Sequence, residues 1–269
     1  MLYFIGLGLS NERDVTLRGL DAIQSSTSIY LETYTSILTT SKTHLEKLYQ
    51  KPIIEADRDF VEENADTILT QAKTSIVSFL VVGDPFSATT HSDLWLRAKE
   101  QGIKVKIIHN ASIMNAISST GLQSYRFGEA ISLPFFTETW KPTSFYEKLI
   151  KNYEGGLHTL VLLDIKVKEP TVESLARGGP KKYMEPRFMS VNQGLEQLLE
   201  VERVLKKGVL GKESLVVGVA RLGADDEMIV AGKVEEVMKV EFGKELHSIV
   251  VPAKDLHFHE SQVLDTFRL

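Results

Sequence analysis

The sequence contains no cysteine among its 269 residues. This absence excludes disulfide bonds, thiolate catalysis and zinc sites with cysteine ligands, and it is consistent with a reducing compartment. The histidines show no spacing typical of a zinc site built from two histidines and an acid. His257 and His259, two residues apart, would lie on different faces of a helix. We therefore expect no metal site.

Long hydrophobic runs are missing as well. Met1–Leu9 is apolar, but no basic residues precede it, polar and acidic residues follow it, and it is too short to span a bilayer. We interpret it as a buried strand rather than a signal peptide. The net charge of -5 and the pI of about 5.9 show no basic excess of the kind that marks nucleic-acid-binding proteins. The composition thus predicts neither a membrane segment nor a direct nucleic-acid partner.

Several catalytic and cofactor signatures are also absent. Gly6-Leu7-Gly8-Leu9-Ser10 follows the first apolar run, but position 11 is Asn, so the third glycine of the dinucleotide fingerprint is missing. No Gly-Lys-Ser/Thr follows, which excludes a phosphate-binding P-loop. No Gly-x-Ser-x-Gly elbow or Ser-His-Asp order is visible. A nicotinamide dehydrogenase and a serine hydrolase are therefore excluded.

The first part of the chain alternates short apolar strands with amphipathic helices. This rhythm predicts a parallel sheet covered by helices. Strands are expected at 2–7, 28–31, 76–82 and 104–108, and helices at 15–23, 43–49, 61–72, 92–101 and from 112 to 119.

The second part has a different pattern, with strands close enough together for antiparallel pairing. We expect a mixed sheet with strands at 130–136, 159–165, 215–220, 228–234 and 248–251, and a strong helix at 193–205. The pattern changes near Thr120-Gly121, so two α/β domains are predicted, 1–120 and 121–269. Glu169–Arg187 is rich in Pro, Gly and charge, and is expected to be a mobile loop or a partner-binding arm.

Gly83-Asp84-Pro85 ends the dense apolar run 76–82. Such a run is typical of a strand buried on both faces of a parallel sheet, and open α/β sheets bind ligands at the carboxyl ends of their strands. The Asp84 carboxylate there suits a ligand with positive charge or hydroxyl groups, whereas the alternative is an ordinary turn with a helix-capping aspartate. A second glycine turn at Gly6–Gly8 favours a cleft between the two turns.

Two further strand ends carry polar side chains. Ser112, in the stretch His109–Ala116, is either a helix N-cap or a hydroxyl offered to a ligand. Asp164 and Lys166 end the apolar run 159–165 and are candidates for a cleft. The residues alone predict a two-domain α/β ligand-binding protein that is an enzyme.

Eight segments resemble the diphthine synthase family and follow one another in the order found there, and 83–91 and 163–169 resemble its eukaryotic branch. The match of each segment alone is weak evidence, but the series runs through nearly the whole chain. The segments are Leu2–Leu9, Leu31–Ser36, Gly83–His91, His109–Ala116, Gly121–Gly128, Gly156–Glu169, Ala220–Gly223 and Leu246–Ser248.

The resemblance implies the tetrapyrrole-methylase fold, in which an N-terminal parallel βαβ domain and a C-terminal mixed-sheet domain enclose a cofactor cleft. It implies S-adenosyl-L-methionine as cofactor and S-adenosyl-L-homocysteine as product. The implied substrate is the 3-amino-3-carboxypropyl-histidine of translation elongation factor 2. The amine would be trimethylated and, in eukaryotic members, the carboxylate esterified, giving diphthine methyl ester. A homodimer in the cytoplasm is implied too.

The resemblance also implies which residues bind the cofactor, although it indicates no obligatory general base. Asp84 would act through its charge or its turn geometry, Ser87 through its small size, and Ser112 through its hydroxyl. The apolar members would contribute backbone groups and walls, and His247 would contact adenine or be structural. The implied set is Leu9, Asp84, Ser87, Ser112, Ile113, Leu163, Leu222 and His247.

The sequence departs from the family's pattern at one place, and two other functions are alternatives to this interpretation. Near Tyr183 the family's Pro-Pro-Arg pattern reads Glu185-Pro186-Arg187, which affects the flanking loop. One rival is a methyltransferase of the same fold that acts on a tetrapyrrole, and the long match outside the cofactor segments argues against it. The other is a non-catalytic protein that binds the elongation factor, and the intact glycine turns argue against that.

Overall fold

The computed structural model describes residues 1–168 and 183–269. Most of the predicted loop or arm, Glu169–Arg187, therefore lies outside the described residues. Contacts within the chain divide it into two compact units, Met1–Met114 with Lys166–Pro186, and Asn115–Ile165 with Arg187–Leu269. The domain boundary between residues 120 and 121 stays a prediction.

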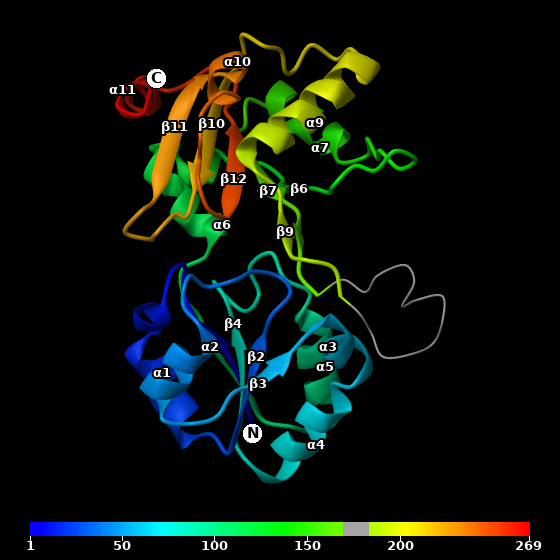
Figure 1. Cartoon of the computed structure of the whole chain (residues 1–269), viewed down its shortest axis with the longest axis vertical. Coiled ribbons are helices and arrows are strands. Elements are labelled where there is room, and N and C mark those ends of the chain that lie inside the picture. The colour runs from blue at the N-terminus through cyan, green and yellow to red at the C-terminus, as the bar shows by residue number, and fades with distance from the viewer. Residues whose placement is uncertain (169–182) are drawn as a thin grey trace. The chain divides into compact units, whose positions relative to one another are not determined.

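The first unit contains a sheet of five strands that all run parallel (Figure 1). The order across the sheet is β3-β2-β4-β1-β5, and β1 pairs with both β4 and β5. This confirms the predicted parallel sheet. The strands are β1 (Leu2–Gly6), β2 (Ser28–Glu32), β3 (Ile54–Ala56), β4 (Val77–Val81) and β5 (Val105–Ile108).

Helices cover both faces of this sheet. Alternate residues of β1 enter different cores: Phe4 packs in the core with residues of α4 and α5, and Ile5 in the core with residues of α1 and α2. Both faces are therefore apolar, which explains the unbroken hydrophobic runs. The helices are α1 (Leu17–Ser25), α2 (Lys42–Tyr49), α3 (Arg58–Glu63), α4 (Asp66–Thr74) and α5 (Ser92–Glu100). The short helix α6 (Ile113–Ala116) begins in the first unit and ends in the second.

Two local predictions for this unit are wrong. The single helix expected at 61–72 is two helices, because α3 ends at Glu63 and α4 begins at Asp66. The short strand β3 was not predicted, because two of its three residues are exposed and it has no apolar run.

The second unit contains the mixed sheet that the sequence predicts. Its order is β11-β10-β12-β7-β6, with β6 and β7 parallel and the other pairs antiparallel. Two short strands, β8 (Ile165–Lys166) and β9 (Arg187–Phe188), form a separate ladder. The sheet strands are β6 (Ile131–Leu133), β7 (Thr159–Leu163), β10 (Leu215–Ala220), β11 (Met228–Lys233) and β12 (His247–Val251).

The longest helix of this unit is α9 (Val191–Leu205), which Ser190 caps by accepting from the Gln193 amide. Its buried face includes Leu195 and Leu198, which join the core of the mixed sheet. The other helices are α7 (Tyr146–Glu154), α10 (Val234–Val237) and α11 (Phe258–Asp265). Of the helices in the described part of the chain, none has the length and apolar character needed to cross a bilayer.

Candidate functional site

The order of the parallel sheet identifies a topological switch point between β1 and β4. From β1 the chain crosses to β2, which lies beyond β4, and from β4 it crosses to β5, which lies beyond β1. The two connections thus leave the neighbouring strands in opposite directions. In open α/β sheets, ligands bind outside the carboxyl ends of the strands at such a point. The turns after β1 and β4, at Gly6–Gly8 and Gly83, flank this point.

These two glycine turns are joined directly through their backbones. Gly8 donates to the Gly83 carbonyl at 3.2 Å, and Gly83 donates to the Gly8 carbonyl at 2.7 Å. A Cβ at Gly6 would lie 2.5 Å from the Gly83 oxygen, so only glycine permits this approach. Gly83 has φ +74°, and a Cβ there would lie 3.3 Å from the Ser112 Cβ. The two turns at the switch point are therefore packed together through glycine backbone.

The Asp84 carboxylate connects the turn after β4 with the turn after β5. Its Oδ1 accepts from the Phe86 amide at 2.9 Å and from the Ser87 hydroxyl at 3.3 Å. Its Oδ2 accepts from the Asn110 amide at 3.2 Å and contacts His109 Nδ1 at 2.7 Å. Because β4 and β5 lie on opposite sides of β1, these bonds span the end of β1. Asp84 thus holds the two turns together through hydrogen bonds and also places a carboxylate between them.

Burial disfavours ionisation of Asp84, but the hydrogen bonds outweigh it. Donation from the Phe86 amide, from His109 and from the Asn110 amide lowers the pKa of Asp84 below its ordinary value. The Asp84 residue is only 6% exposed. The end of the parallel sheet therefore holds a negative charge at neutral pH, which suits a cationic ligand.

Asn110 lies at the same strand ends, but the sequence interpretation does not assign it to the site. Its side-chain Nδ2 donates to the Gly6 carbonyl at 3.0 Å and to the Asp14 carbonyl at 2.9 Å. His109 is likewise not among the residues predicted to bind the cofactor. The signal for both was their place directly after β5, at the same edge of the sheet as Gly83.

Five of the eight predicted cofactor residues lie in the first unit, at the ends of the strands around the switch point. Asp84 and Ser87 are hydrogen-bonded to each other. Ser112 is buried and faces Gly83, and Ile113 begins α6 directly after it. Leu9 is half-buried and follows the Gly8–Gly83 bridge. The first unit thus brings this subset together.

The other three, Leu163, Leu222 and His247, lie in the second unit. Leu163 ends β7 and is half-buried, and Leu222 follows β10 and is buried. His247 begins β12 and pairs with Ala220 of β10, so it lies at the same end of that pair as Leu222. The cleft predicted between the two domains, and a cofactor role for the eight residues, stay predictions.

Both ring nitrogens of His247 have partners within the second unit. Nδ1 accepts from the Val191 amide at 3.3 Å, and Nε2 donates to the Lys244 carbonyl at 2.7 Å. Burial lowers the pKa of His247 although the Lys244 carbonyl favours the protonated ring. The imidazole is thus neutral at physiological pH, and its nitrogens hold the start of β12 to the start of α9. Any contact that His247 makes with a ligand comes from its ring face or backbone.

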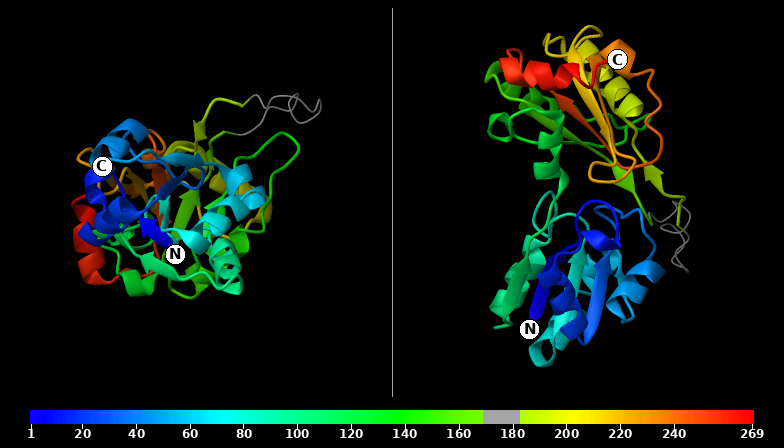
Figure 2. Two further views of the ribbon diagram at one scale, coloured as in Figure 1. Left: turned by 90° about the horizontal axis from the view of Figure 1, so that it is seen from below. Right: turned by 90° about the vertical axis from the view of Figure 1, so that its left-hand side faces the viewer.

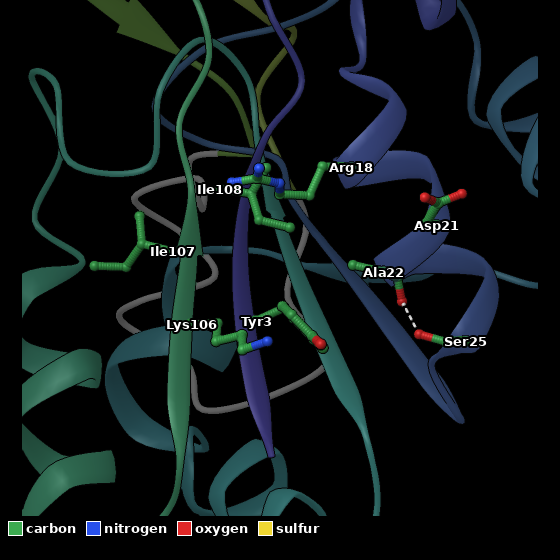
Figure 3. Close-up of a pocket in the computed structure, with 8 residues that line it drawn as sticks. All are labelled: Tyr3, Arg18, Asp21, Ala22, Ser25, Lys106, Ile107 and Ile108. Carbon is green, nitrogen blue, oxygen red and sulfur yellow. Dashed lines mark hydrogen bonds between the residues drawn. The ribbon is translucent and has the colours of Figure 1, made fainter.

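A separate surface pocket of about 400 Å³ lies along α1 and the edge strand β5 (Figure 3). It contains none of the predicted cofactor residues. Arg18 and Asp21 come from α1, and Lys106 comes from β5 beside the ring of Tyr3. Its lining residues are Tyr3, Arg18, Asp21, Ala22, Ser25, Lys106, Ile107 and Ile108. In the described residues, no group of three or more acidic or histidine side chains is placed to hold a metal ion.

Comparisons with known proteins identify the family. The family model for Tetrapyrrole (Corrin/Porphyrin) Methylases matches residues 1–238. The diphthine methyl ester synthase of Dictyostelium discoideum is 52% identical over 271 residues, covering 100% of this chain and 98% of that protein. The Homo sapiens diphthine methyl ester synthase is 49% identical over 273 residues, covering 100% and 95%.

Solved structures of diphthine synthases have the same fold as this chain. A crystal structure from Entamoeba histolytica assigned to diphthine synthase has a TM-score of 0.88 and 45% identity, covering 100% of this chain and 98% of that one. A diphthine synthase crystal structure has a TM-score of 0.85 and 33% identity, with coverage of 99% and 95%. Both confirm the predicted fold. Because the family model matches most of the chain and full-length relatives share about half of its residues, the chain belongs to the tetrapyrrole methylase family and, within it, to the diphthine methyl ester synthases.

Proposed function

We propose that this protein is the S-adenosylmethionine-dependent methyltransferase that converts the 3-amino-3-carboxypropyl-histidine of translation elongation factor 2 into diphthine methyl ester. Three methyl groups go to the amine and a fourth to the carboxylate. The observation that carries the proposal is the pair of glycine turns fused at the switch point around buried Asp84. Relatives that carry this name cover the whole chain at 49–52% identity.

The residues of the first unit fit the proposed cofactor. The cofactor is a cation at its sulfonium and ammonium groups, and Asp84 keeps a negative charge in the site. Gly83 has no side chain to block the turn, and a Cβ there would meet Ser112. Ser112 is buried, and its hydroxyl and the Leu9 backbone would contact polar groups of the cofactor. Leu163, Leu222 and His247 would supply apolar and aromatic surface from the second unit.

When bound, the cofactor would supply an electrophilic methyl group for transfer to the substrate nitrogen or oxygen, with S-adenosylhomocysteine as the leaving product. The protein's task is alignment, because the sulfonium is already a good leaving group. Asp84, His109 and Asn110 fix the turns against which the methyl donor would rest. The amine must lose a proton before each attack, and no residue of the predicted site is assigned as its base. The carboxylate attacks without one.

The proposal includes partners and location. The protein substrate is elongation factor 2, and the enzyme is a homodimer that contacts neither membrane nor nucleic acid directly. It works in the cytoplasm, and the absence of cysteine and the acidic pI of about 5.9 are consistent with that. Light scattering measures the dimer, with a mass of about twice the 30.1 kDa of one chain as the expected result.

Intact-mass spectrometry tests the activity. Elongation factor 2 carrying the unmethylated precursor is incubated with this protein and S-adenosylmethionine. Four added methyl groups are expected, the last of them labile to mild base. Elongation factor with an unmodified histidine is the matched control and should gain none. Three stable additions would mean that the enzyme stops at the trimethylated amine. Cofactor binding without any addition would contradict the proposed substrate.

A further inference from the structure

One loop of the second unit presents an exposed tryptophan. Residues 134–145, here named the Trp140 loop, connect β6 to α7, and Figures 1 and 2 show this green segment extending away from the mixed sheet. Trp140 is 54% exposed although indole is one of the largest apolar groups in proteins. Tryptophan is enriched in protein–protein interfaces, where its large apolar ring becomes buried and its indole N–H finds a partner.

The Trp140 loop is bonded within itself and to α9. The Thr137 amide donates to the Trp140 carbonyl at 3.0 Å, and the Trp140 amide donates to the Thr137 hydroxyl at 3.0 Å. Lys141 Nζ lies 2.7 Å from Glu200 Oε1 on α9. A loop ordered before binding loses less conformational entropy when a partner docks. The indole is thus presented rather than merely left outside the core.

The base of the loop is fixed by a buried glutamine of α9. Gln197 is 8% exposed; its Oε1 accepts from the Phe136 amide at 2.9 Å, and its Nε2 donates to the Pro134 carbonyl at 2.8 Å. The Arg187 guanidinium lies over the Phe135 ring at 4.8 Å. These contacts occupy the loop's backbone and buried ring, and leave the Trp140 indole facing solvent.

The same loop begins beside a predicted cofactor residue. Leu133, the last residue of β6, is paired with Leu163 at the end of β7. Asp164 donates its amide to the Leu133 carbonyl at 3.1 Å, and its Oδ2 accepts from the Phe135 amide at 3.1 Å. The loop therefore leads from the predicted methyl-transfer site to the exposed indole within a few residues.

We propose that the Trp140 loop is the docking element for the protein substrate, with the Trp140 indole as its anchor on the surface beside the modified histidine. This inference rests on the proposed function. An enzyme that modifies one side chain of a folded protein must hold that protein close to its site, and interfaces concentrate binding energy in buried tryptophans. A second copy of this chain is the weaker occupant, because a narrow loop offers a single anchor whereas a stable dimer buries about 800 Å² per partner.

Trp140→Ala tests the proposal in a binding assay. The full-length variant is titrated with elongation factor 2 carrying the precursor, in the presence of S-adenosylhomocysteine. We expect the Kd for the elongation factor to rise about 10-fold or more, while the Kd for S-adenosylhomocysteine and the melting temperature stay at wild-type values. The Kd of the Trp140→Phe variant for the elongation factor should lie between those of the wild type and Trp140→Ala. In the methylation assay KM should rise with little change in kcat.

Phe258→Ala is the matched control. Phe258 is an exposed aromatic of the same unit, 60% exposed, on α11, away from the loop (Figure 1). The Phe258→Ala variant should bind the elongation factor with the Kd of the wild type. An unchanged Kd for Trp140→Ala overturns the inference while leaving the proposed function intact, since the wild type still methylates. A variant that changes oligomeric mass assigns the loop to a second copy and also overturns it. A wild type that methylates nothing overturns both proposals.

Discussion

His91 Nε2 lies 4.0 Å from Glu32 Oε2, and each residue is only 1% exposed. Neither ring nitrogen of His91 has a hydrogen-bond partner. The Glu32 carboxylate is bonded instead to the Tyr34 and Thr35 amides, at 2.7 and 2.6 Å. The end of β2 and the end of the turn after β4 therefore lie beside the neutral His91 imidazole, whose nitrogens form no hydrogen bond.

This relationship predicts a pH-dependent stability. Burial lowers the pKa of His91 from 6.5 to about 4. Between these values the unfolded chain binds a proton that the folded chain does not, so His91 makes stability fall as pH decreases from 6.5 toward 4. The full effect is on the order of 3 kcal/mol, from about 1.4 kcal/mol per pKa unit.

His91→Leu should remove this slope. Leucine has no polar atoms to leave unsatisfied, so unfolding free energy at pH 7 should be unchanged or higher than that of the wild type. Urea titrations of both proteins between pH 4 and 7.5 measure the difference. Burial raises the pKa of nearby Glu32, whose contribution therefore weakens as pH rises, but Glu32 is present in both proteins. Parallel curves for the two proteins would contradict the prediction.

Asp84→Asn should weaken cofactor binding without unfolding the protein. The amide can keep the bond from the Phe86 amide, but it loses the charge that faces His109 and the bonds that a second carboxylate oxygen accepts. Loss of one charge-assisted contact between the carboxylate and a cationic group of the cofactor costs about 1.5–3 kcal/mol, so the Kd for S-adenosylmethionine should rise by about 10-fold or more. Calorimetry measures the Kd. Wild-type affinity would remove Asp84 from the site.

Gly6→Ala should separate the fused turns. Its Cβ would lie 2.5 Å from the Gly83 oxygen and 2.8 Å from the Asn110 Cβ, so backbone must move. We expect a loss of about 2 kcal/mol or more of stability and a loss of cofactor affinity. Gly102→Ala is the matched control: it has φ +69° and open space around it, so strain of about 1 kcal/mol and normal affinity are expected. Equal behaviour of the two variants would contradict the close-approach argument.

The sequence predicts the central features of the site because they depend on local patterns. The apolar run that becomes β4 and the glycine turn at Gly83 are both local, and together they place Asp84 at a strand end. The bond from Asp84 to His109 was not predictable in this way. It requires the sheet order that puts β4 and β5 on either side of β1, and that order arises from packing of helices far apart in sequence.

The helices of the second unit show the same limit. The sequence predicts α9, whose apolar residues recur at helical spacing, but it does not predict α11. Only Glu260 and Leu264 of α11 are buried, so no apolar stripe marks it. Glu260 is held by tertiary partners: Arg126 Nη1 at 2.6 Å and His158 Nε2 at 2.9 Å. A buried carboxylate of this kind is specified by residues more than 100 positions away, which no local pattern contains.

Arg221→Lys should loosen the turns that carry Leu222 and His247. The Arg221 guanidinium donates to the Phe242 carbonyl at 2.8 Å, to the Lys244 carbonyl, and to Asp226 through its side chain and backbone. A lysine keeps the charge but cannot supply this planar set of donors, so several carbonyls lose their partner. Melting curves should show a loss of about 2 kcal/mol.

The matched control for Arg221 is Arg268→Lys, because the exposed Arg268 side chain pairs with the nearby Asp265 at 2.8 Å. That variant should stay within about 0.5 kcal/mol of the wild type. If Leu222 and His247 bind the cofactor as proposed, Arg221→Lys also weakens S-adenosylmethionine binding, whereas Arg268→Lys does not. Reduced stability with unchanged affinity would place the turn after β10 outside the cofactor site, and would leave the residues around Asp84 as the part of the site that carries binding.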